Sequence, residues 1–83
     1  MLFRSALAQH GLGFMYFQGE CTRADPAEAA RWFRLAADQG MAGSQSTLAM
    51  MYEKGVGVER DAALAARWRA LSEQDAGAAP ATS

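Results

Sequence analysis

The chain repeats itself at an interval of 36 residues. Residues 25–32 read DPAEAARW, and residues 61–68 read DAALAARW. Tyr16 and Tyr52, which precede the two copies, are also 36 residues apart. A fixed period of roughly 20 to 50 residues is the signature of stacked-repeat proteins, in which each unit buries its apolar face against the next. This period therefore constrains the fold more than any other feature of the sequence.

Within each copy, apolar residues recur at spacings of three and four, the period of an amphipathic helix. Asp25 and Asp61 stand where helix caps are needed, and Glu28 is placed to close a capping box with Asp25. We predict four helices, at residues 2–18, from the cap Asp25 to the stop at Gly40, at 43–54, and from the cap Asp61 to near Gln74.

The short connections between these helices force neighbours to run antiparallel. The expected fold class is therefore all-α: an α/α superhelical solenoid of two helix-turn-helix repeats, at about residues 5–40 and 41–75 of a domain covering 1–75. Residues 76–83 lack periodicity and are expected to form a disordered tail. The residues assigned to the core of the repeats are those that recur at the period: Leu12, Tyr16, Gly19, Trp32, Leu48, Tyr52, Gly55 and Trp68.

Two glycines lie inside the first predicted helix, where each costs about 1 kcal/mol relative to alanine. They are Gly11 and Gly13. A neighbouring backbone that leaves no room for a Cβ atom would explain Gly13.

The composition excludes several classes of protein. A hydrophobic content of 51% and a net charge of -1 are typical of a globular chain and lack the basic stripe of a nucleic-acid binder. No apolar run has the length of a membrane span, and the N-terminus makes a poor signal peptide, which slightly favours the cytoplasm. Export of a trimmed parent stays open. The single cysteine, Cys21, excludes an intrachain disulfide and leaves a cross-link between chains as an alternative.

Residues 8–19, AQHGLGFMYFQG, followed by residues 25–40 with their ending ADQG, resemble a Sel1-like repeat, a relative of the tetratricopeptide repeat. The second unit, residues 45–74, resembles it too, most clearly in GVGV at 55–58. The first unit departs from this pattern, because Cys21 stands where Gly57 stands in the second unit. If that position needs a positive φ, Cys21 strains or reshapes the loop.

The resemblance implies a scaffold that binds a protein or peptide on the concave face lined by the first helix of each unit, the A helix. The A-helix positions not used in the core share one side of each helix. Three of them are apolar and suit a peptide groove, or burial against a second copy of the chain, since two repeats are fewer than a stable stack usually needs. The positions expected to contact a partner are His10, Phe14, Phe17, Gln18, Ser46, Met50, Glu53 and Lys54.

No residue pattern points to catalysis, a metal or a cofactor. His10 is the only histidine and has no partner group nearby in the sequence, and the two aspartates Asp25 and Asp61 are explained by capping. There is no phosphate loop, zinc spacing or nucleophile elbow. Arginines of the B helices, the second helix of each unit, are expected on a solvated outer face; they are Arg31, Arg34, Arg67 and Arg69.

Two other functions are kept as alternatives to the scaffold. Some cysteine-rich relatives of this repeat act as weak hydrolases on β-lactam-type ligands, although they carry paired cysteines that this chain lacks. The other alternative is structural: a cap or fragment of a longer solenoid, or a small homodimer.

Overall fold

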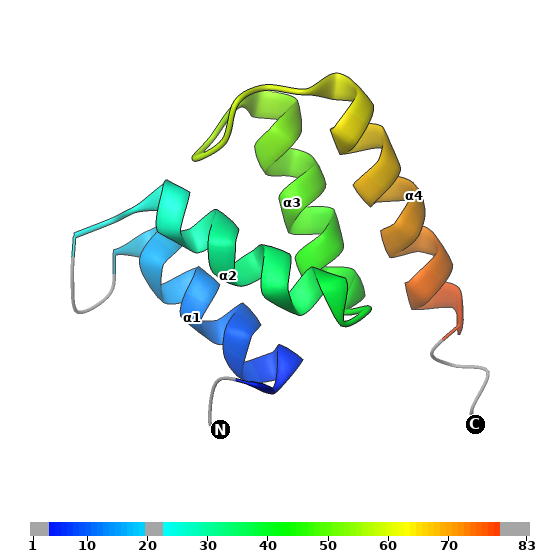
Figure 1. The fold of residues 1–83 in the computed structure, drawn as a ribbon, viewed down its shortest axis with the longest axis horizontal. Helices are drawn as coiled ribbons and strands as arrows, with labels where there is room; N and C mark the ends of the chain where they lie inside the picture. Colours follow the sequence, from blue (N-terminus) through cyan, green and yellow to red (C-terminus); the bar gives the residue numbers. More distant parts are fainter. Residues whose placement is uncertain (1–3, 20–22, 79–83) are drawn as a thin grey trace.

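The computed structural model describes residues 4–19 and 23–78 and contains four helices in this part of the chain (Figure 1). They are α1 (Ala6–Gln18), α2 (Pro26–Asp38), α3 (Ala42–Lys54) and α4 (Ala62–Ala78). Each helix packs against its neighbour in sequence, so that α2 lies between α1 and α3. The predicted all-α arrangement of two helix-turn-helix units is confirmed, with α1 and α3 as the A helices.

The helices begin where capping chemistry allows. The Glu28 backbone N–H donates to Asp25 Oδ1 at 3.1 Å, and the same bond in the second unit joins Leu64 to Asp61 Oδ1. Both predicted caps are therefore confirmed. The predicted capping box is not formed, because the Asp25 backbone N–H donates to the Tyr16 carbonyl instead. The side chain of Glu28 faces Arg31, at 3.8 Å.

Both ends of the predicted helical region differ from expectation. Helix α1 begins at Ala6, where Ser5 Oγ caps it, and residues 1–3 lie outside the described part. Helix α4 continues to Ala78, so the expected tail is wrong for residues 76–78. A hydrogen bond of 2.7 Å from Gln45 Nε2 to Asp75 Oδ2 ties the last turns of α4 to α3. Residues 79–83, the rest of that tail, lie outside the described residues, as does Cys21.

Each repeat is closed by the same kind of amide contact. In the first unit Gln39 Nε2 donates to Gln9 Oε1 at 2.8 Å, and in the second Gln45 Nε2 donates to Asp75 Oδ2. The buried Gln45 amide also donates to the Ala37 carbonyl at 3.0 Å, which links α3 back to α2. These contacts fix the register of one helix on the next, because buried polar groups need their partners.

The most deeply buried large side chains are not the repeating aromatics. Phe33, Leu48 and Met51 are the large side chains that are fully buried, and alanines of α2 surround them. Of the eight residues assigned to the core, Leu48 is fully buried, and the four aromatics and Leu12 are half-buried; Tyr16, Tyr52 and Trp68 pack against the central cluster. Gly19 and Gly55 end α1 and α3 as left-handed C-caps, as expected of glycines at helix ends.

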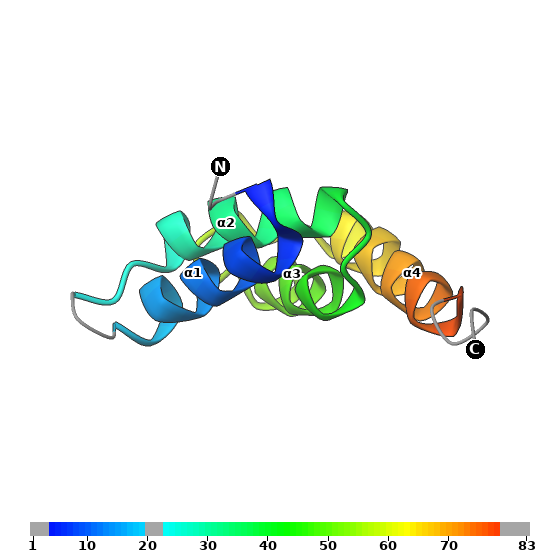
Figure 2. The same ribbon diagram turned by 90° about the horizontal axis from the view of Figure 1, so that it is seen from below.

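The molecule is too thin to enclose more. It measures 39 × 32 × 16 Å, and Figure 2 shows a shallow arch with little depth. In that view α2 lies above α1 and α3, so only two rows of helices span this depth. Every helix therefore keeps one side exposed, which leaves room for interaction surfaces on both faces.

Gly13 is explained by a side chain and not by the backbone that was predicted. A Cβ atom built at Gly13 would lie 2.8 Å from the Phe33 ring, whereas one at Gly11 would meet nothing within 4 Å. Because Gly13 has no Cβ atom, the Phe33 ring can pack directly against the backbone of α1.

The two glycines therefore predict opposite effects of one substitution. Gly11→Ala should raise the free energy of unfolding by about 0.5 to 1 kcal/mol, because alanine is the better helix former and has space. Gly13→Ala should lower it by about 1 to 3 kcal/mol, because the methyl group overpacks the Phe33 ring. Urea titrations followed by circular dichroism measure both. Equal effects of the two changes would contradict the packing described.

Candidate interaction site

The A-helix face consists of the eight predicted contact residues on α1 and α3, which the structure places at different depths. Phe14 is the large apolar side chain most open to solvent among them, at 44% exposure. Phe17 and Met50 are half-buried and pack against the core cluster. His10 is half-buried as well, and the exposed members are Gln18, Ser46, Glu53 and Lys54.

An aromatic cluster holds Phe14 in place. Its ring meets His10 edge-on with centroids 5.5 Å apart, and it meets Phe33 edge-on at 6.1 Å. His10 also packs on Phe33 at 5.2 Å. Edge-to-face pairs of this kind contribute about 0.5 to 1.5 kcal/mol beyond the area that they bury. Phe14 is thus a supported aromatic side chain whose outer surface is free.

His10 has a partner that sequence spacing did not reveal. Its Nδ1 lies 2.6 Å from Ser44 Oγ, across the joint between α1 and α3. Sequence distance hid the pair, because the two residues are brought together only by stacking the repeats. A serine beside a histidine resembles a nucleophile and its base, but Ser44 is fully buried, so its hydroxyl offers no surface to a substrate. The bond therefore serves to join the repeats.

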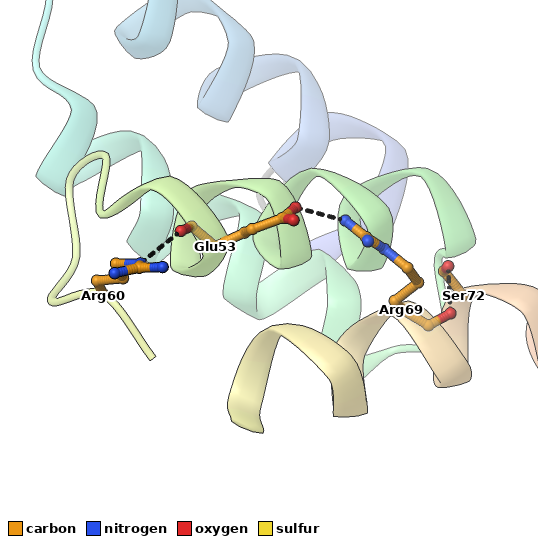
Figure 3. A network of polar contacts seen from close by, with 4 residues as sticks. All are labelled: Glu53, Arg60, Arg69 and Ser72. Carbon is orange, nitrogen blue, oxygen red and sulfur yellow. Dashed lines mark hydrogen bonds and ion pairs between the residues drawn. The ribbon is translucent and has the colours of Figure 1, made fainter. Parts of the chain in front are cut away.

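The polar end of the A-helix face is held by the second hairpin. Arg69 Nη2 of α4 lies 2.9 Å from Glu53 Oε1, and Arg60 Nε donates to the Glu53 backbone carbonyl at 3.1 Å (Figure 3). The Ser72 hydroxyl donates to the Arg69 carbonyl in the same view. Exposed ion pairs add little stability, about 0 to 1 kcal/mol, but this one orients the carboxylate. Arg69 thus has a partner and does not simply point into solvent.

A hollow on the side of α2 was missed by the sequence analysis. It holds about 520 Å³, and Arg31 and Arg34 stand at its edge. The rest of its lining is mostly apolar: Ala27, Ala30, Leu35, Leu48, Tyr52, Gly57 and Val58. These arginines were predicted on a solvated face, and they do lie exposed, but they border this hollow.

A smaller hollow of about 260 Å³ is lined by residues of α4 and by Arg34, which also lines the first hollow. The Arg34 guanidinium lies 5.6 Å from the centre of the Trp68 ring and 3.3 Å from Asp38 Oδ1. One sequence signal for this side existed. Leu35 and Leu71 are 36 residues apart, and both are exposed. A repeated leucine that the core does not use marks a surface.

Two kinds of site find no support in the part of the chain that the structure describes. No group of three histidine, cysteine, aspartate or glutamate side chains there is placed to hold a metal ion. None of the four helices is both long and apolar enough to cross a membrane, over the same residues.

The repeat unit itself decides the family. The Sel1 repeat model matches residues 6–41 and 42–68, which together are most of the chain. The chain belongs to the Sel1 repeat family. Such repeats generally mediate contacts between proteins. Among curated proteins, none matches the chain.

Solved structures of other Sel1 repeat proteins share the fold. A Sel1 repeat protein from Oxalobacter formigenes superposes with a TM-score of 0.84 at 30% identity, over 86% of this chain and 29% of its own. A protective antigen of uropathogenic Escherichia coli strains that displays an SLR fold gives a TM-score of 0.84 at 38% identity, over 86% of this chain and 15% of its own. This Sel1 chain thus spans less than a third of either relative.

The His10 contact predicts how stability depends on pH. Burial lowers the pKa of His10 below its ordinary value of 6.5, because the charged ring loses water. The unfolded chain then binds the proton more readily than the folded one, so the contribution is complete above about pH 6.5 and is lost as pH falls through the folded pKa. The free energy of unfolding should therefore fall on acidification.

Urea titrations at pH 7.5 and pH 5 measure this effect. The matched control is His10→Gln, which keeps a polar side chain and removes the titration. We expect the wild type to lose more stability between the two pH values than the variant loses. Equal losses in the two proteins would show that His10 is not the group responsible.

Proposed function

We propose that the chain is a protein-interaction module that binds a peptide or partner segment on its A-helix face and has no chemistry of its own. The observation that carries the proposal is Phe14, a large aromatic side chain at 44% exposure on a helix of a repeat family that mediates protein contacts. Large aromatics that protrude from a supported position are the side chains that dominate binding energy at interfaces.

The surroundings of Phe14 fit this role. His10 and Phe33 hold its ring from behind, so little side-chain freedom is lost when a partner covers it. Phe17 and Met50 provide half-buried apolar surface, and the carboxylate of Glu53 is oriented by Arg69. An amphipathic helix or extended segment that places an apolar side chain on Phe14 and a basic group near Glu53 is the partner that this chemistry recognises.

The test is affinity capture from the native lysate with mass spectrometry, using Phe14→Ala and a matched control. Leu35→Ala is that control, because Leu35 has nearly the same exposure, 46%, and lies beside the hollow on α2. We expect Phe14→Ala to weaken capture at least tenfold, about 1.4 kcal/mol, and Leu35→Ala to leave it unchanged. Phe17 is unsuitable for this test, because it packs on the core and its loss also lowers stability.

The reverse result would contradict the assignment of the face. If capture survives Phe14→Ala and fails with Leu35→Ala, the partner binds along α2. Circular dichroism of both variants at the assay temperature checks that each is folded.

The proposal that the chain is not an enzyme has its own test. Ser44 and His10 form a hydrogen-bonded serine–histidine pair in the described part of the chain, and Ser44 is buried. We expect no turnover of a chromogenic ester or a β-lactam above the rate in buffer. Turnover that follows the protein through purification and disappears with Ser44→Ala would overturn this expectation and favour the hydrolase alternative.

A further inference from the structure

Two methionines occupy the same position of the two repeats and have opposite environments. Met51 on α3 is fully buried, at 0% exposure, whereas Met15 on α1 is 39% exposed. Met51 is covered because it packs in one cluster with Phe33 and Ala37 of the preceding helix, α2. The corresponding side of α1 is exposed in the described residues, since Leu7 there is exposed as well.

Gly11 lies in the middle of this exposed side. It is four residues from Leu7 and four from Met15, so the three lie along one ridge of α1. Leu7 is 71% exposed, and a Cβ atom at Gly11 would meet nothing within 4 Å. Unlike Gly13, Gly11 has no packing contact among the described residues that requires a glycine. A glycine flanked by two exposed apolar side chains allows another helix to approach closely.

Helix α4, at the other end of the molecule, does not complement the exposed ridge of α1. The residues of α2 that share the core cluster with Leu48 and Met51 of α3 are Ala29, Ala30, Phe33 and Ala37. The residues 36 positions later on α4 are Ala65, which is buried, and Ala66, Arg69 and Glu73, which are exposed. Two charged side chains in place of Phe33 and Ala37 make α4 unsuited to stack on the apolar ridge of a second copy. Head-to-tail association of two chains is thereby disfavoured, since it would bury both charges.

Helix α1 matches itself instead. Its 13 residues, ALAQHGLGFMYFQ, include no aspartate, glutamate, lysine or arginine, so two copies meet without charge repulsion. In an antiparallel pair crossing at Gly11, Leu7 of each copy faces Met15 of the other, which is a self-complementary twofold contact. We propose that this surface, Leu7, Gly11 and Met15, joins two copies of the chain through antiparallel pairing of their α1 helices. The inference does not depend on the proposed function.

The dimer should be weak and concentration-dependent. A helix of 13 residues is about 20 Å long. A pair of such helices buries less than the roughly 1,200 to 2,000 Å² of a standard stable interface. We therefore expect a dissociation constant above about 1 µM, with dimer formed well below about 1 mM.

Sedimentation velocity over this concentration range is the first measurement. Leu7→Glu combined with Met15→Glu should leave a monomer at every concentration. The matched control, Leu35→Glu combined with Leu71→Glu, changes two similarly exposed apolar residues on α2 and α4 and should dimerise as the wild type does. Gly11→Gln keeps the helix and should weaken dimerisation at least tenfold. A wild type that stays monomeric up to about 1 mM would overturn the proposal.

A mixing experiment tests whether Leu7 and Met15 of one copy contact the same residues of a second copy. The acidic variant carries Leu7→Glu and Met15→Glu, and the basic variant carries Leu7→Lys and Met15→Lys. Each alone should sediment as a monomer, while the equimolar mixture should form one-to-one dimers, because every cross-helix contact then joins opposite charges. A mixture that stays monomeric at concentrations where the wild type dimerises would contradict pairing through these residues.

Discussion

The structure depends on one contact, the ring of Phe33 seated on the bare backbone of Gly13. Phe33 is fully buried in α2, touches α1 through Gly13 and His10, and shares a cluster with Leu48 and Met51 of α3. One side chain thus joins three of the four helices. Removing a buried phenylalanine costs about 3 to 5 kcal/mol, which is a large fraction of what a domain of this size has. The part-buried Ser44–His10 and the buried Gln45–Ala37 hydrogen bonds lie along the same joint and fix its register.

Because the molecule is thin, its candidate binding sites are open surfaces. With a depth of 16 Å, the chain cannot enclose a deep site, and its apolar residues are shared between a small core and several open surfaces. Three of these surfaces are distinct: the A-helix face around Phe14, the hollow along α2 with its arginines, and the ridge of α1 around Gly11. The first is supported from behind by the central phenylalanine, so the joint that holds the repeats together also presents the proposed contact residue.

The architecture was predictable from the sequence because the 36-residue period indicates two stacked units of the same fold. The period, the two aspartate caps and the C-terminal glycines are local features that place four helices and their order. The identity of the central residue was not predictable in the same way. Phe33 has Arg69 as its counterpart, so a search for recurring residues favoured Trp32 and Trp68 instead. The His10–Ser44 contact joins residues 34 positions apart across two repeats, and no spacing rule reveals it. The hollow along α2 likewise forms only when a loop of the second unit meets the first.

A double-mutant cycle between Gly13→Ala and Phe33→Leu tests the central claim most directly. The free energy of unfolding is measured for the wild type, both single variants and the double variant. A smaller side chain at position 33 makes room for the added methyl group, so the double variant should be less destabilised than the sum of the two singles by at least about 1 kcal/mol. Additive losses, within about 0.3 to 0.5 kcal/mol, would show that the two residues do not meet and would contradict the account of how the repeats are joined.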